Sequence, residues 1–201
     1  MSISKVRRVR AGKAGREPEA GPYALPTTAS RAALLKGGSD RSFRVLVADL
    51  LTISTRMELV REHLGRRMGI SGPQYSLIVA VAHLQGVNGI SVGALAQALH
   101  VSSAFIASEA GKLARRRLLL KRTNPDDRRG VLLSVAPAGR LAVDRVSTEI
   151  RAVNDLFFGA LDAVTFAALS DAAGALIESS ANAVRYIASV KGTPQSLRIA
   201  G

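Results

Sequence analysis

The sequence predicts a mainly α-helical fold with one small β-hairpin, and three observations support this fold class. Several stretches place apolar residues at alternating steps of four and three, which is the period of one helix face. Serines and a proline stand where helices are expected to begin. Between two apolar runs, the segment 124–130 holds an asparagine, a proline, aspartates and a glycine, a composition typical of the turn of a hairpin.

The first two helices are predicted from their apolar pattern and from the segment that separates them. Apolar residues at positions 46, 50, 53, 57, 60 and 64 predict a first helix from Phe43 to Met68. Glycines at 69 and 72 with Pro73 interrupt the pattern, because neither residue type favours a helix interior. The almost wholly apolar stretch 74–84 is expected to form the second helix.

Two serine-capped helices follow a glycine-rich loop at 86–89. Ser91 is placed to cap a short third helix over residues 92–100, and Ser102 to cap a fourth helix that runs to about Arg117. After the hairpin, Pro137 suits the first turn of a fifth helix that reaches about residue 161. The sixth helix follows Asp162, with apolar or small residues at 166, 169, 173, 176, 180, 184 and 187.

The hairpin between the fourth and fifth helices carries the strongest functional signal. Its strands are expected at 118–120 and 131–133, and Arg128 and Arg129 stand at its tip. The end of the helix directly upstream, 112–117, is also basic. A hairpin with arginines directly after a basic helix is the arrangement with which a winged helix holds DNA.

Composition favours a polyanionic partner. The formal charge is +13 and the sequence pI is about 11.3, so nucleic acid is the first candidate and an anionic membrane surface the second. The chain has no cysteine, which excludes disulfides and thiolate metal sites. No apolar stretch approaches the ~18 residues needed to cross a bilayer. Residues 1–39 hold eight basic and two acidic residues with several glycines and prolines, so we expect a largely disordered extension.

The order of elements and the residues at its centre resemble the MarR family of bacterial transcription regulators. The resemblance covers about residues 40–190, and its ordered spacing is specific where any single piece would be weak. The segments that carry it are Ile70-Ser-Gly-Pro-Gln-Tyr75, Ile90-Ser-Val-Gly-Ala-Leu-Ala-Gln-Ala-Leu99, Val101-Ser-Ser-Ala-Phe-Ile106, Asn124-Pro-Asp-Asp-Arg-Arg-Gly-Val131 and Pro137-Ala-Gly139.

The resemblance implies a winged helix-turn-helix protein that forms a homodimer and binds double-stranded DNA at a palindromic operator, often until a small molecule releases it. The first, fifth and sixth helices would intertwine in the dimer. The expected divisions are the extension 1–39, the dimerisation region 40–70 and 137–190, the DNA-binding lobe 71–136 and the C-terminal tail 191–201.

Three positions depart from the family pattern. Ala136 stands where relatives usually have a threonine before the fifth helix, and alanine provides no cap, at a cost of about 1 kcal/mol. Arg117 replaces the usual glycine after the fourth helix and adopts a left-handed turn less easily. Ala107 and Ser108 replace the arginine or threonine of some relatives, so base contacts do not transfer directly.

The fourth helix and the hairpin supply the candidate DNA contacts. An α-helix fits the major groove, with its N-terminal residues facing the bases. The hydroxyls of Ser102 and Ser103 suit contact with phosphate. Phe105 either touches thymine methyl groups or packs in the core. At most one of the arginines at 115–117 is expected on DNA, because a helix spreads them around its circumference. The candidates are Ser102, Ser103, Phe105, Lys112, Arg122, Arg128 and Arg129.

Acidic neighbours limit two of these assignments. Glu109 either accepts from a cytosine amino group or pairs with Lys112 along the helix, and we favour the intrahelical pair. At the hairpin tip, one arginine is expected to enter a minor groove. The other is expected to pair with Asp126 or Asp127 and stiffen the turn.

A ligand site, if the protein has one, is expected where the first helix meets the second. The candidates are His63, Arg66 and Tyr75, with Arg67 beside them. An arginine favours an anionic ligand, and the alternative interpretation is that all four are ordinary surface or packing residues. The sequence names no ligand.

The sequence therefore predicts a regulator of transcription, acting as a repressor in the cytoplasm. It carries no phosphate-binding glycine loop, no HExxH, no GxSxG and no clustered acids, so neither an enzyme nor a cofactor or metal site is expected. The alternative function is an architectural protein that coats DNA without regard to sequence. Competition with random DNA separates the two, because a regulator prefers its site by ~10³ or more.

Overall fold

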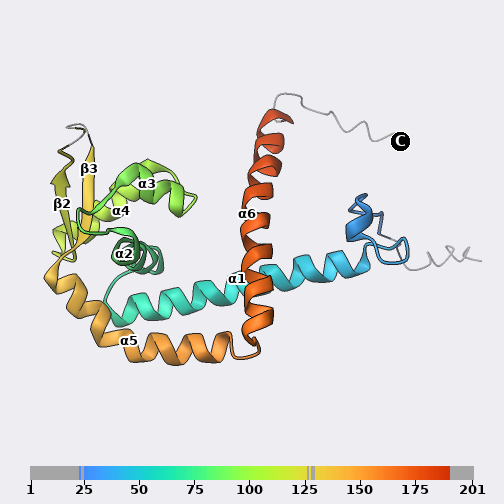
Figure 1. Cartoon of the computed structure of the whole chain (residues 1–201), viewed down its shortest axis with the longest axis horizontal. Coiled ribbons are helices and arrows are strands. Elements are labelled where there is room, and N and C mark those ends of the chain that lie inside the picture. The colour runs from blue at the N-terminus through green and yellow to red at the C-terminus, as the bar shows by residue number, and fades with distance from the viewer. Residues whose placement is uncertain (1–22, 24, 126, 128–129, 191–201) are drawn as a thin grey trace, which may run out of the picture. The chain divides into compact units, whose positions relative to one another are not determined.

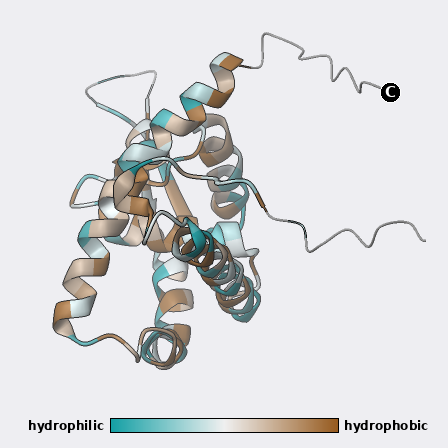
Figure 2. Cartoon of the chain, turned by 90° about the vertical axis from the view of Figure 1, so that its right-hand side faces the viewer, coloured by the Kyte–Doolittle hydropathy of each residue, from teal (hydrophilic) through white to brown (hydrophobic). Residues whose placement is uncertain are grey.

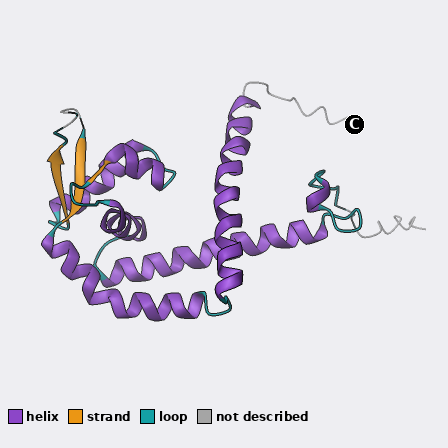
Figure 3. Ribbon diagram, in the orientation of Figure 1, coloured by secondary structure: helices purple, strands orange, loops and turns teal. Residues whose placement is uncertain are grey.

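The computed structural model describes residues 23, 25–125, 127 and 130–190, which fall into two units, 1–55 and 56–201. Apart from a 3-10 turn at Ala32–Leu34, the described elements are six α-helices and three short strands (Figures 1 and 3). In chain order they are α1 Arg41–Arg67, α2 Gly72–Leu84, β1 Ile90–Ser91, α3 Val92–Ala98, α4 Ser103–Arg115, β2 Leu119–Thr123, β3 Val131–Val135, α5 Pro137–Phe157 and α6 Ala163–Val190.

The predicted order of helices and hairpin is confirmed, and the helix ends are determined by local chemistry. Ser91 and Ser102 cap α3 and α4 as expected, by accepting from the backbone N–H of Ala94 and Phe105 at 3.1 Å each. The third helix ends two residues earlier than predicted. His100 follows with a φ of 52°, a left-handed conformation that a helix cannot continue.

The segment before α2 contains a capping box. The Ser71 hydroxyl accepts from Gln74 N at 3.4 Å, and the Gln74 side-chain oxygen accepts from Ser71 N at 3.3 Å. Gly72 and Pro73 lie in the first turn of α2, where the backbone N–H that proline lacks is not needed. They begin the second helix and do not merely separate it from the first.

The sheet has three strands, where the sequence predicted two. The hairpin strands pair as expected, with Leu119 opposite Val135 and Thr123 opposite Val131. In addition, β1 pairs with the other edge of β3, with Ile90 opposite Leu133, so the strand order is β1-β3-β2. A strand of only two residues has no detectable alternation, and its partner is 43 positions away in the pairing of Ile90 with Leu133.

The core of the second unit joins α2, α3, α4 and the sheet. Its fully buried side chains come from all of these elements and from the end of α1, and they include Leu64, Leu77, Ile78, Val81, Leu95, Ile106, Leu113, Leu119 and Leu133. The side chain of Gln85, just after α2, accepts from Val135 N at 2.8 Å and ties α2 to the end of the sheet. This core fixes the fourth helix and the hairpin in one lobe.

The last helix has a different environment. Asp162 accepts from Thr165 N at 2.8 Å and caps α6, which follows it as predicted. Within the described chain none of the 28 residues of α6 is buried, although hydrophobic segments (brown in Figure 2) recur along the long helices. Its exposed large apolar residues are Val164, Phe166, Leu169, Leu176, Ile177, Val184, Tyr186, Ile187 and Val190.

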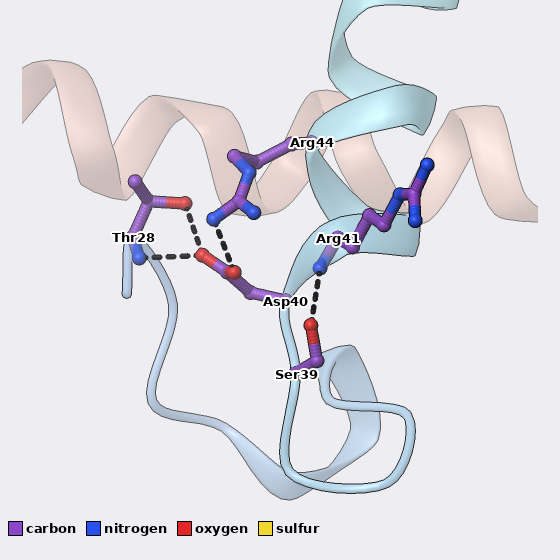
Figure 4. Close-up of polar contacts among 5 residues, drawn as sticks. All are labelled: Thr28, Ser39, Asp40, Arg41 and Arg44. Atoms are coloured by element: carbon purple, nitrogen blue, oxygen red, sulfur yellow. Dashed lines mark hydrogen bonds and ion pairs between the residues drawn. The ribbon is translucent and has the colours of Figure 1, made fainter. Parts of the chain in front are cut away.

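The described part of the first unit contains a polar clasp at the start of α1 (Figure 4). Asp40 is 3% exposed and accepts from Thr28 N at 2.6 Å and Thr28 Oγ1 at 2.7 Å. It also pairs with Arg44. The hydrogen bonds from Thr28, with help from Arg44, lower the pKa of Asp40. Residues 25–39 thus include defined local structure, and disorder in the predicted extension stays a prediction for residues 1–22, which lie outside the described residues.

No helix in the described ranges is long and apolar enough to cross a membrane.

Candidate nucleic-acid interface

The fourth helix has one buried face and one exposed face. Ile106, Ala110 and Leu113 are completely buried, which fixes the rotation of the helix against α2 and α3. In its first half the exposed face carries Phe105 and otherwise small residues, among them Ala104, Ala107 and Ser108. Small side chains allow the backbone of a helix to approach another surface closely, as docking into a DNA groove requires.

The N-terminal end of α4 presents three of the predicted DNA contacts. Ser102 and Ser103 are exposed, and the Ser102 hydroxyl keeps its own hydrogen for donation because it accepts from Phe105 N. Phe105 is 39% exposed, so it is not a core residue; Ile106 fills that role. The exposed serines stand at the positive end of the helix dipole, where anions are favoured.

Glu109 pairs with Lys112, as favoured from the sequence. The carboxylate of Glu109 accepts from Lys112 Nζ at 2.5 Å and from Gln74 Nε2 at 3.0 Å. The hydrogen bond from Lys112, more than that from Gln74, lowers the pKa of Glu109 against the opposing effect of burial. Glu109 belongs to the buried face of α4, so an acceptor role toward cytosine is not supported.

The arginines after α4 have separate roles. The Arg116 guanidinium donates to the carbonyl oxygen of Gly69, in the connection between α1 and α2. Arg117 has a φ of 58°, a left-handed conformation that glycine adopts more easily than arginine. The arginines at 115–117 are all exposed.

The hairpin places Arg122 on its outer strand. Arg122 is exposed, pairs with Leu132 in the ladder, and donates to the Asn88 carbonyl at 3.3 Å. The turn is closed by Asn124 N donating to Gly130 O at 2.9 Å. Arg128 and Arg129, the two predicted contacts at the tip, lie outside the described residues, as does Asp126.

The predicted ligand residues do not converge on one cavity. His63 Nε2 and Arg67 Nε contact the two carboxylate oxygens of Glu149 on α5, at 2.6 and 3.0 Å. These contacts, led by that of His63, lower the pKa of Glu149. Arg66 is exposed in the last turn of α1. His63 therefore belongs to a contact between two helices of the second unit.

Tyr75 does line a cavity. It is 8% exposed, and burial raises the pKa of its hydroxyl. The cavity measures about 110 Å³, and Arg61 is the cation in its lining. The other lining residues are Met57, Val60, Leu64, Asn154, Phe157 and Phe158.

A larger cavity of about 430 Å³ lies between the end of α1, the start of α2 and the connection from α3 to α4. Phe105 of α4 and Ser76 of α2 both line it. No group of three or more histidines or acidic residues that would hold a metal ion occurs among the described residues.

Gln74, Gln85, Arg116 and Glu149 organise this region and were not selected from the sequence. For Gln74 a signal existed, because Ser71-Gly-Pro-Gln74 has the S-x-x-Q spacing of a capping box. The remaining contacts join residues 47 to 86 positions apart, such as Arg116 with Gly69 and His63 with Glu149. No local pattern marks such pairs.

Comparison with known proteins identifies this arrangement. Residues 68–130 match the model of the MarR family. No curated protein matches the chain. Among solved structures, a MarR-family transcriptional regulator from Listeria monocytogenes in complex with a 26mer DNA is 17% identical, with a TM-score of 0.61 over 75% of this chain and 97% of that chain.

Two further solved structures are similar. MepR of S. aureus, in a DNA complex, is 14% identical with a TM-score of 0.58, covering 66% of this chain and 96% of that one. BpsR of Bordetella bronchiseptica, whose DNA binding is regulated by 6-hydroxynicotinic acid, is 21% identical with a TM-score of 0.53, covering 65% and 98%.

At these identities the solved structures show the fold alone, and the match to the family model is confined to the central segment. The fold is a winged helix. The match to the MarR family model covers residues 68–130, which hold α2, α3, α4 and most of the hairpin.

Proposed function

We propose that this protein is a sequence-specific repressor that binds a palindromic DNA operator as a homodimer. The observation that carries the proposal is the exposed face of α4, which has Ser102, Ser103 and Phe105 at its N-terminal end. Small residues follow as far as Gly111, before the exposed Lys112. This surface fits a major groove, and the β2–β3 hairpin begins four residues after the helix ends. Solved relatives of this fold from Listeria monocytogenes and S. aureus are DNA complexes.

Selection of bound sequences from a random DNA pool tests this function directly. We expect an enriched inverted repeat with half-sites about one helical turn apart, ~10–10.5 bp, because each lobe of a dimer reads one half-site. Competition with random DNA should show a preference of ~10³ or more. Strong binding without enrichment of any sequence would instead identify an architectural DNA-binding protein. Either protein is predicted to act in the cytoplasm.

The wing contact is tested with Arg128→Ala plus Arg129→Ala. Operator affinity should fall several-fold or more, because arginines at a hairpin tip reach the minor groove. The control is Arg145→Ala plus Arg151→Ala on α5, which removes the same charge from exposed positions outside the lobe. An equal loss of operator affinity in both variants would indicate a general effect of charge and would contradict a direct contact between the hairpin tip and DNA.

The homodimer is supported by the exposed apolar residues of α6. Because none of its 28 residues is buried, α6 gains little stability from packing against the described part of its own chain. An exposed apolar surface of this extent marks an interaction site. A second copy satisfies it, since isologous dimers are the commonest soluble oligomers. Sedimentation analysis should give a dimer for the wild type and a monomer for Leu169→Glu plus Ile177→Glu; a monomeric wild type at high concentration would refute the proposal.

Release by a small anionic ligand is proposed for the cavity at Tyr75. Arg61 provides a cation there, Tyr75 a hydroxyl and Asn154 an amide, in an otherwise apolar lining. Because BpsR responds to 6-hydroxynicotinic acid, this compound is a suitable probe. It should raise the melting temperature of the wild type and weaken operator binding, and Arg61→Met should abolish both effects.

A further inference from the structure

Glu109 places a carboxylate on the buried face of α4, the helix proposed to bind DNA. It is 8% exposed and shares the buried face of α4 with Ile106, Ala110 and Leu113. A buried carboxylate is costly unless it is paired and hydrogen-bonded. Here one oxygen accepts from Lys112 Nζ at 2.5 Å and the other from Gln74 Nε2 at 3.0 Å. Among the described residues, Lys112 is the cation that forms an ion pair with this carboxylate.

Lys112 stands between two anions, one permanent and one that arrives with DNA. Its side chain is 49% exposed, whereas that of Glu109 is 11% exposed. The ammonium group of Lys112 thus contacts Glu109 while about half of the side chain stays exposed to solvent. Lysine is a compact charge on a flexible stem, so a change of partner needs only rotation of the side chain. If Lys112 leaves, however, Glu109 retains only the neutral amide of Gln74, and an unpaired buried charge is penalised.

We propose that Glu109 acts as an internal competitor for DNA phosphate, which keeps Lys112 from contacting DNA of random sequence. This inference rests on the proposed DNA-binding function. On a matching site, the contacts of the whole lobe hold one phosphate within reach of Lys112, and the lysine changes partner. On random DNA no phosphate is fixed there, so Lys112 stays on Glu109. Glu109 thereby raises specificity by lowering non-specific affinity, and it is a positioning residue that acts through Lys112.

The variant Glu109→Gln tests this mechanism. The amide keeps the shape and an acceptor for Gln74, but it removes the charge that holds Lys112. Affinity for random DNA should rise, and the slope of log affinity against log salt should steepen by about 0.9 for each protomer, because one more phosphate is neutralised. Operator affinity should change less, so the specificity ratio should fall. A merely structural role would not steepen the salt slope.

The control is Glu58→Gln on α1. Glu58 pairs with Arg61 three residues later, at 3.6 Å, so the substitution breaks the same kind of pair and changes net charge equally. Its salt slope should match the wild type. The double variant Glu109→Gln plus Lys112→Met should also return to the slope of the wild type on random DNA, because the released cation is then absent.

Lys112→Met in the wild-type background gives a second measurement that does not depend on replacing a buried group. It should lower operator affinity and leave the salt slope on random DNA unchanged. If this variant flattens the slope on random DNA, or if Glu109→Gln behaves like Glu58→Gln, the competition mechanism is overturned while operator binding by the wild type still supports the proposed function. A wild type without any preferred sequence would overturn the proposed function itself.

Discussion

The backbone of Gly139, in the first turn of α5, lies so close to the carbonyl oxygen of Leu118 that no side-chain carbon fits between them. A Cβ at position 139 would overlap that oxygen and would lie 2.9 Å from Val135 Cγ1. Ala136 N also donates to Leu118 O at 3.0 Å, so the start of α5 and the start of the hairpin are held at one point.

The first prediction concerns this contact. Gly139→Ala should lower the free energy of unfolding by about 3 kcal/mol, because both close neighbours belong to packed backbone and core. The matched control is Gly111→Ala in α4, where the nearest atom to a new Cβ is Arg115 Nη1 at 3.8 Å. That variant should be more stable than the wild type by about 0.5–1 kcal/mol, the usual gain for alanine in a helix. Chemical denaturation at one protein concentration measures both.

The second prediction concerns the missing cap of α5. Ala136 occupies the N-cap position and makes no side-chain cap hydrogen bond, as the sequence predicted. Ala136→Ser should stabilise the protein by about 1 kcal/mol, because the hydroxyl satisfies a free N–H in the first turn. Ala138→Ser, inside the same turn, should give no such gain in melting temperature. Equal effects at the two positions would mean that the cap is not the cause.

The third prediction concerns the left-handed residue after α4. Arg117→Gly should raise the free energy of unfolding by about 1 kcal/mol, since glycine adopts a φ of this sign without steric cost. Arg115→Gly, inside the right-handed helix, should instead lower stability by about 1 kcal/mol. Thermal unfolding compares the two variants, each of which loses one positive charge. A destabilised Arg117→Gly variant would show that the arginine side chain outweighs its backbone strain.

The fourth prediction follows from Glu149. Its pKa is lowered by His63 first and Arg67 second, so the contact contributes stability above the ordinary value of 4.5 and loses it as pH falls through the lower folded value. The wild type should therefore exceed Glu149→Gln in stability at neutral pH. The difference should shrink as pH is lowered below 4.5. Denaturation curves across this range measure it; a difference that does not vary with pH would contradict the ionic origin.

Local chemistry made most of the fold predictable. Ser91 and Ser102 cap helices because the serine hydroxyl oxygen accepts from the backbone N–H three residues later. This relation joins positions that are close in the sequence, so it can be predicted from the sequence. The strand Ile90–Ser91 was not predictable in this way, because only its pairing with β3 makes it a strand. The sequence likewise predicted the missing cap at Ala136 but not the approach of Gly139 to Leu118.

The candidate site was predictable in part. The Glu109–Lys112 pair follows from helix spacing, since residues three apart are neighbours. The burial of Glu109 and its bond to Gln74 depend on how α2 meets α4, which no single segment encodes. The same reasoning explains His63, whose partner Glu149 lies on another helix.

The side chain of Gln74 ends in one amide that serves two helices: its oxygen closes the capping box of α2, and its nitrogen reaches Glu109 on α4. Substitutions at Ser71 and at Glu109 are therefore not independent, although the residues are on different elements. In a double-mutant cycle their free energies should fail to add, by ~0.5 kcal/mol or more. The helix that begins the lobe and the helix proposed to read DNA thus form one thermodynamic unit.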